Sequence, residues 1–159
     1  MRYKVAPPPR SLDFLERARG AIPLVPGDEA DCCRAIQRET DVGDRETAQA
    51  YLVFLRALGL VAESDRGYYR TRTEPARPEL AAAFRENVFA AAELLDALDD
   101  GETRTGAAVF ERVRDAFPRW ERERHADWER VWRARVDNLL GWAVVFGLAA
   151  RTDDGYEAR

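Results

Sequence analysis

One stretch of the chain occurs twice, and this repeat constrains the fold more than any other feature of the sequence. Residues 51–70 (YLVFLRALGLVAESDRGYYR) align with residues 139–158 (LLGWAVVFGLAARTDDGYEA) at a constant offset of 88 positions. Glycine, aspartate and tyrosine recur in both copies, and the first two are residue types that shape helix ends and turns. The chain therefore contains two modules that share one local structure. Seven of the twenty aligned positions are identical: Leu52/Leu140, Gly59/Gly147, Leu60/Leu148, Ala62/Ala150, Asp65/Asp153, Gly67/Gly155 and Tyr68/Tyr156.

Each copy predicts a helix, a stop and a β-hairpin. In the first copy, apolar residues at positions 51, 52, 55 and 58 recur at three- and four-residue spacing, which is one face of a helix. Gly59 follows where a helix commonly ends in a left-handed residue. Residues 60–62 then form a strand, Asp65-Arg66-Gly67 supplies the turn, and residues 68–70 return as a second strand.

A helix that ends in Gly-Leu and continues into a short hairpin resembles the third helix and wing of winged helix-turn-helix proteins. The resemblance covers nearly the whole chain, as two tandem winged-helix modules, and it implies a mainly α fold with small β-hairpin wings. We therefore expect an N-terminal arm at residues 1–10, a first module at 11–72, a linker at 73–78 and a second module at 79–159.

In the first module, three residues with short polar side chains are predicted to cap helices at 12–19, at about 29–39 and at 45–58; they are Ser11, Asp28 and Asp44. Three consecutive prolines, Pro7 to Pro9, exclude helix from the basic arm. The arm either lies over a partner or straps its own domain.

The second module is predicted to begin with one long helix from Glu79 to Leu98, about 30 Å in length, which offers a surface for a homodimer. Thr105 is predicted to cap a helix at 106–117, which Pro118 ends. A charged insertion at 119–126 follows, and residues 127–146 form the third helix of this module.

The composition indicates the source of the protein. Lys4 is the only lysine among 25 basic residues, and the remaining 24 are arginine. This bias, together with abundant acidic residues and alanine, indicates a haloarchaeal protein, with a high-GC actinobacterium as the other source. No apolar segment resembles a signal peptide or a membrane span, so a cytoplasmic location is expected.

The sequence does not predict an enzyme. His125 is the only histidine, and the chain contains no glycine-rich phosphate loop and no cluster with metal-ligand spacing. Cys32 and Cys33 are neighbours, and two cysteines alone do not complete a tetrahedral metal site. We interpret them as small buried residues of the core. No catalytic residue, cofactor or metal is therefore predicted.

The resemblance implies binding of double-stranded DNA, with the third helix in the major groove and the wing on the backbone. Asp41 and Asp44, at the start of the first third helix, would repel phosphate, and the net charge is only −4. Arg72 adds to the positive charge of the first wing. The residues expected to enter a groove are Arg45, Gln49 and Arg56, and those expected to contact phosphate are Arg66, Arg70, Arg119, Arg122, Arg130 and Arg133.

A second interpretation stays open beside that of a transcriptional regulator. The arginines can be a solvated face paired with acids at helical spacing. The outward side of the last helix has small and apolar residues that suit a protein interface: Ala134, Asp137, Gly141 and Val144. Some paired winged-helix proteins, such as kleisin-associated partners of condensin and the ESCRT-II subunits, resemble this architecture and work as scaffolds. The alternative function is therefore a protein–protein adaptor that does not bind DNA.

Overall fold

The computed structural model describes residues 6–72, 76–117, 119–124 and 126–159. The start of the predicted arm (1–5) and half of the predicted linker (73–75), together with Pro118 and His125, lie outside the described residues. The chain divides into two compact units, with the boundary between Val88 and Phe89. We call them the first unit and the second unit and describe each by itself.

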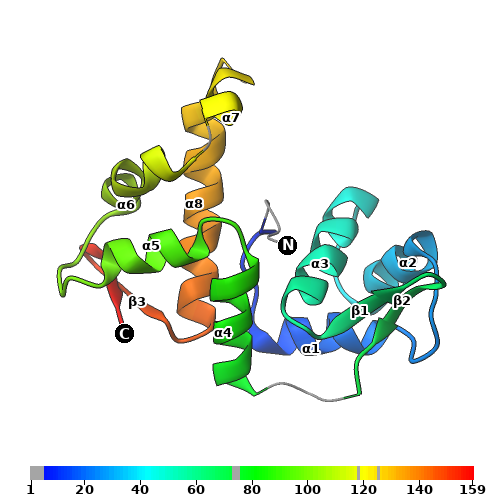
Figure 1. Ribbon diagram of the computed structural model, residues 1–159. Helices are drawn as coiled ribbons and strands as arrows, with labels where there is room; N and C mark the ends of the chain where they lie inside the picture. Colours follow the sequence, from blue (N-terminus) through cyan, green and yellow to red (C-terminus); the bar gives the residue numbers. More distant parts are fainter. Residues whose placement is uncertain (1–5, 73–75, 118, 125) are drawn as a thin grey trace. The chain divides into compact units, whose positions relative to one another are not determined.

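The first unit contains the predicted three helices and wing, followed by one further helix. All three predicted N-caps are confirmed, because their side chains accept hydrogen bonds from the backbone N–H groups of Phe14, Asp31 and Thr47. The elements are α1 (Leu12–Ala21), α2 (Glu29–Glu39), α3 (Arg45–Ala57), β1 (Val61–Ser64), β2 (Gly67–Arg70) and α4 (Arg77–Asn87) (Figure 1).

The core of the first unit lies between its helices and includes both cysteines. Phe14 packs on Tyr51 with ring centroids 4.8 Å apart. Cys32 and Cys33 are only 1% and 0% exposed, and neither forms a disulfide. Their interpretation as core residues is confirmed. Burial raises the pKa of the Cys32 thiol to about 11 and also raises that of Cys33, so both are uncharged at neutral pH.

The second unit repeats this plan with an additional short helix. Its elements are α5 (Ala91–Leu98), α6 (Gly106–Val113), the 3₁₀ turn η1 (Arg114–Ala116), α7 (Arg119–Arg124), α8 (Trp128–Val145), β3 (Ala149–Thr152) and β4 (Gly155–Ala158). The helix expected over 106–117 therefore changes to a 3₁₀ turn after Val113. Part of the charged insertion is the helix α7. An aromatic cluster fills the core, where Phe117 stacks on Trp132 with centroids 4.3 Å apart.

The prediction of one helix from Glu79 to Leu98 is wrong. Helix α4 ends at Asn87, α5 begins at Ala91, and Ala90 between them has a left-handed φ of 69°. Packing is the physical reason. The Asn87 side-chain amide donates to the backbone carbonyl of Ala57 in the first unit, at 2.8 Å. The Phe89 ring packs against Trp132 in the second unit, at 5.7 Å. The boundary between the two units, after Val88, therefore lies beyond the linker predicted at residues 73–78.

The two hairpins confirm the expectation of small β-wings and have the same construction. Strand β1 pairs antiparallel with β2, and β3 pairs with β4, each through a two-residue turn. Gly59 and Gly147 lie two residues after the last residues of α3 and α8, with φ of 81° and 76°. In each unit the next residue, a leucine, donates back to a carbonyl five residues earlier (3.0 and 2.8 Å), which closes the helix.

In each unit, the chain segment that precedes α2 or α6 pairs with the second strand of the wing. Gly27 exchanges two backbone hydrogen bonds with Tyr68, of 2.9 and 2.8 Å. Arg104 does the same with Tyr156, at 2.8 and 2.7 Å. The segment runs along the edge of β2 or β4, so each hairpin is held against its own helices. This backbone pairing explains why Gly-Tyr recurs at the start of β2 and β4.

Candidate nucleic-acid interface

Two of the three side chains predicted to enter a DNA groove are already engaged inside the first unit. The side-chain amide of Gln49 donates to the Glu29 carboxylate at 2.6 Å. The Arg56 guanidinium forms an ion pair with Glu63 at 2.6 Å. Arg45, at the start of α3, is exposed. Burial raises the pKa of the Cys33 thiol, and the nearby Arg45 partly offsets this rise. The structure therefore leaves Arg45 as the most accessible cation at the N-terminus of α3.

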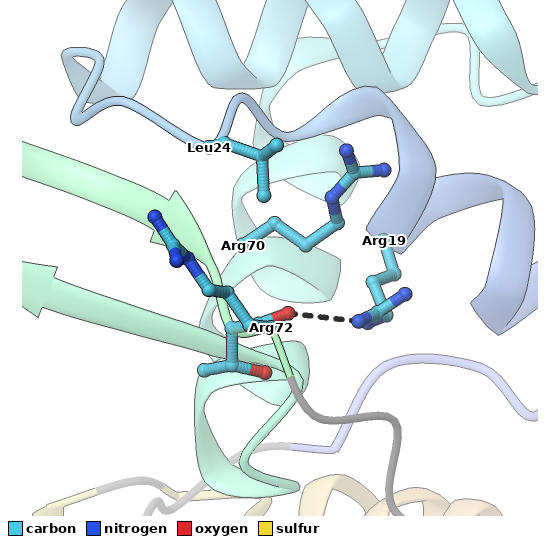
Figure 2. Close-up of a pocket in the computed structure, with 5 residues that line it drawn as sticks. Arg19, Leu24, Arg70 and Arg72 are labelled. Carbon is cyan, nitrogen blue, oxygen red and sulfur yellow. Dashed lines mark hydrogen bonds between the residues drawn. The ribbon is translucent and has the colours of Figure 1, made fainter.

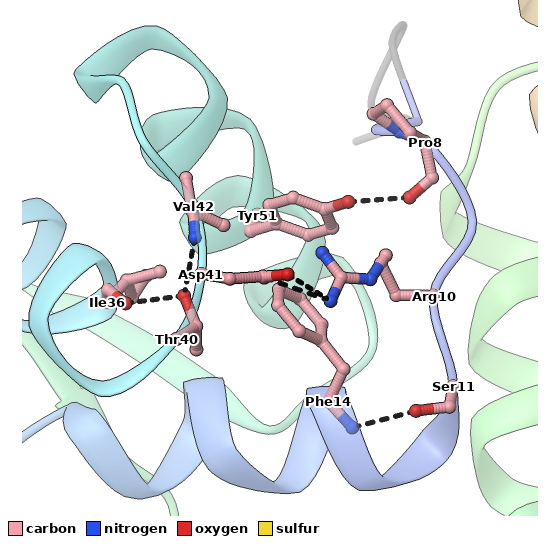
Figure 3. Close-up of polar contacts among 9 residues, drawn as sticks. All are labelled: Pro8, Arg10, Ser11, Phe14, Ile36, Thr40, Asp41, Val42 and Tyr51. Atoms are coloured by element: carbon pink, nitrogen blue, oxygen red, sulfur yellow. Dashed lines mark hydrogen bonds and ion pairs between the residues drawn. The ribbon is translucent and has the colours of Figure 1, made fainter.

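The acidic residue that precedes α3 is neutralised by the arm. Arg10 lies 2.9 Å from one carboxylate oxygen of Asp41 and donates to the other at 3.2 Å (Figure 3). The hydrogen bond from Arg10 holds the pKa of Asp41 below its ordinary value. Asp44 has a different role, because its carboxylate caps α3 and the Thr47 backbone N–H lowers its pKa.

Residues 6–10 of the arm strap the first unit. The Tyr51 hydroxyl donates to the carbonyl of Pro8 at 2.7 Å, and the Arg10 guanidinium lies over the Phe14 ring at 4.1 Å. Ala6 is buried, with 4% of its surface exposed. Of the two alternatives for the arm, the described part therefore lies over its own domain.

The first wing presents arginines that are not neutralised by acids. No ion pair of Arg66, Arg70 or Arg72 occurs within the part of the chain that the structure describes, whereas many other arginines in the same ranges contact a carboxylate. Arg66 is exposed at the tip of the hairpin, in the two-residue turn between Ser64 and Gly67. The wing therefore carries net positive charge toward solvent.

A pocket lies at the base of this wing. It has a volume of about 590 Å³ and is lined by Arg19, Leu24, Arg70, Thr71 and Arg72 (Figure 2). Arg19 is 6% exposed, and its guanidinium donates to the backbone carbonyl of Thr71 at 2.8 Å. Neither Arg19 nor Leu24 is among the site residues predicted from the sequence. The position of Arg19, four residues after Leu15 on the buried side of α1, could have predicted that Arg19 is buried.

Three of the four arginines on α7 and α8 that were predicted to contact phosphate form ion pairs. Arg119 pairs with Glu123 at 2.9 Å, and Arg133 pairs with Asp137 at 3.3 Å. Arg130 pairs with Asp127. Arg122 lies over the Trp128 ring at 5.9 Å. Their expected role in phosphate contact stays a prediction, but the geometry is that of a solvated helical face.

The predicted protein interface on α8 is accessible. Ala134 and Asp137 are exposed, and Gly141 and Val144 are half-buried. Asp137 is held by Arg133, as described above. The role of this stripe stays a prediction.

Across the described ranges, no group of three or more His, Cys, Asp or Glu side chains is arranged to hold a metal ion. In those same ranges, no helix combines the length and the hydropathy that crossing a bilayer requires.

Comparisons with known proteins identify the family. Comparison with curated proteins and with solved structures finds no significant match. One family model, described as the halobacterial double winged helix domain, matches residues 1–159. The two helical units with their equivalent wings agree with this description. The chain therefore belongs to the halobacterial double winged helix domain family.

Proposed function

We propose that this protein is a cytoplasmic transcriptional regulator that binds double-stranded DNA through its first unit and has no catalytic activity. The family fold is of the DNA-binding type. The observation that carries the proposal is the first wing, where Arg66, Arg70 and Arg72 form no ion pair with the described residues. In this arrangement α3 enters the major groove from its Arg45 end, and the wing contacts backbone phosphates.

Charge favours the first unit over the second. An exposed ion pair at helical spacing is worth only about 0.3–0.5 kcal/mol, so breaking it is not the main obstacle to DNA contact. The carboxylate stays beside the arginine and repels the phosphate that the arginine attracts. Arg130 and Arg133 each form an ion pair with such a carboxylate. Arg66 shares its turn with Asp65 but forms no ion pair with the described residues. The Arg10–Asp41 pair also removes one repulsive charge before α3.

The test measures binding of the full chain to random duplex DNA over a series of KCl concentrations that keep the protein folded. Arg66→Ala is expected to weaken binding and to reduce the slope of log K against log[KCl] by about 0.9, the value for one lost phosphate contact. Arg130→Ala is the matched control, with the same loss of charge, and is expected to bind as the wild type does. Absence of wild-type binding at every KCl concentration would refute the proposal.

A protein adaptor is the second candidate, and a specific observation favours it. Leu24 and Val25 are 56% and 74% exposed, although both are large and apolar. Two adjacent residues of this kind suit a protein contact. If the adaptor function holds, Leu24→Ser/Val25→Ser abolishes association with a protein partner and leaves binding to duplex DNA unchanged. A homodimer is tested in the same samples by light scattering.

A further inference from the structure

We propose that the pocket at the base of the first wing binds a nucleoside phosphate, with the phosphate group at Arg70 and Arg72 and the aromatic base against Tyr69 and Leu24. Binding itself does not depend on the proposed DNA function. Only the expected effect of the nucleotide on DNA binding rests on that function.

The charge of the pocket selects an anion. Three of its five lining residues are arginines, and neither Asp nor Glu lines it. Arg19 brings a positive charge to a position where only 6% of its surface is exposed. The positive charges of these side chains attract an anion that enters the pocket. Their planar fork of N–H donors matches phosphate oxygens in pairs.

An apolar extension of the pocket suits a flat ring. A second depression of about 350 Å³ shares Leu24, Arg70 and Arg72 with the first and adds Pro26, Ser64 and Tyr69. Both volumes lie in the range typical of small-molecule sites. Aromatic side chains and arginine planes stack on nucleobases. A ring placed here would also cover part of Leu24, which is otherwise 56% exposed.

The walls of the pocket connect it to the wing. Strand β2 forms one side, and the segment that contains Leu24 forms the other (Figure 2). The backbone N–H of Arg70 donates to the carbonyl of Pro23 at 2.7 Å, which holds the two sides together. A bound phosphate neutralises Arg70 and Arg72 on the wing that we propose to contact DNA. The nucleotide is therefore expected to weaken DNA binding, and DNA to weaken nucleotide binding by the same factor.

The experiment uses isothermal titration calorimetry on the full chain at one fixed KCl concentration. The ligands are adenosine 5′-monophosphate, uridine 5′-monophosphate, inorganic phosphate and adenosine. At least one nucleotide is expected to bind ten-fold more tightly than inorganic phosphate or adenosine. Arg72→Ala is expected to reduce nucleotide affinity at least ten-fold. Tyr69→Ala is expected to reduce nucleotide affinity without changing that of inorganic phosphate.

Arg66→Ala is the matched control, because Arg66 lies on the same hairpin but does not line the pocket. It is expected to lose DNA affinity and to keep nucleotide affinity. The proposal is overturned if neither nucleotide binds more tightly than inorganic phosphate, or if Arg66→Ala and Arg72→Ala lose nucleotide affinity equally. It is also overturned if Arg72→Ala changes only DNA binding, since the pocket then holds a backbone phosphate. Failure of DNA binding alone leaves nucleotide binding in place.

Discussion

The carbonyl oxygen of Gly27 occupies the space that a side chain at Gly67 would need. A Cβ atom at position 67 would lie 2.2 Å from that oxygen, and φ at Gly67 is +127°. The second unit has the same relationship, because a Cβ at Gly155 would lie 2.2 Å from the Arg104 carbonyl oxygen. Glycine is therefore required at positions 67 and 155, because the segment that precedes α2 or α6 lies against the wing at those positions.

Gly67→Ala is expected to lower the free energy of unfolding by about 2–3 kcal/mol, because it combines a strained backbone with overlap of backbone atoms. Gly155→Ala should have an equal effect in the second unit. All four tryptophans lie after residue 119, so tryptophan fluorescence during guanidinium unfolding reports on this second variant. Gly43→Ala is the control, because a Cβ at that position meets nothing within 4 Å. Gly43→Ala and Gly67→Ala lie in the first unit, which has no tryptophan, so their midpoints are measured by far-ultraviolet circular dichroism. Equal midpoints for these two variants would contradict the prediction.

Removing the carboxylate that faces Arg56 is expected to strengthen DNA binding. Glu63→Gln releases Arg56 from its 2.6 Å ion pair and adds one unit of positive charge beside the first wing. Duplex DNA affinity should rise, with a steeper salt dependence by up to about 0.9 if Arg56 gains a phosphate contact. The measurement is the KCl series described above.

The matched control for Glu63→Gln is Glu157→Gln. Glu157 lies on the second wing, where it accepts a hydrogen bond from Thr103 at 3.0 Å. Both variants change the net charge by the same amount, so a difference between them locates the DNA surface. An equal gain in both variants would mean that only overall charge matters, and the assignment to the first unit would fail.

Asp41 is expected to titrate below the usual range of an aspartate, because the Arg10 hydrogen bond lowers its pKa from 3.8. Because the folded state favours ionised Asp41, this residue stabilises the fold at every pH above its pKa in the unfolded chain. The contribution is lost as the pH falls through the lower pKa that Asp41 has in the folded state. Arg10→Ala should return the Asp41 pKa toward 3.8. The measurement is carboxyl ¹³C NMR as a function of pH.

Asp44 provides the internal control of this titration. Its pKa is lowered by the backbone N–H of Thr47 and not by the arm. In Arg10→Ala the Asp44 curve should therefore stay in place while the Asp41 curve moves. Movement of both curves together would show that the substitution disturbs α3 as a whole, and the strap would have a wider role than neutralising one acid.

The two cysteines are expected to resist alkylation in the native protein. Burial raises the pKa of Cys32 to about 11 from 9.0, and the reactive species is the thiolate. Iodoacetamide at pH 8 should modify neither Cys32 nor Cys33 until denaturant is added, as judged by mass spectrometry. The raised pKa also means that stability contributed by the protonated thiol is lost as the pH rises from 9 toward 11. Rapid native labelling of both residues would contradict their role as core residues.

Much of the fold is encoded in local sequence. The caps at Ser11, Asp28, Asp44 and Thr105 act through hydrogen bonds to backbone groups three residues away. The glycines that end α3 and α8 and the two-residue hairpin turns are likewise short-range features. For this reason the repeat was sufficient to predict two winged modules, and the family match agrees with it.

The candidate site was less predictable, because its properties depend on residues far apart in the chain. Arg19 reaches the pocket of the first wing through a contact with Thr71, across 52 positions of sequence. Arg10 neutralises Asp41 across 31 positions. Sequence spacing did indicate that arginines such as Arg119 would pair with acids along their helix. It did not indicate which wing arginines would stay without an ion pair.

The sequence by itself determined where α1, α2, α3 and α6 begin, how α3 and α8 end and that the plan is repeated, since these features rest on hydrogen bonds within a few residues. Only the tertiary structure decided the break between α4 and α5 and the accessibility of each arginine. The apolar stripe of residues 80–98 continues through the break without a glycine or proline. The chain breaks there because Asn87 and Phe89 have their partners in different units, and that choice is made by packing and not by local conformational preference.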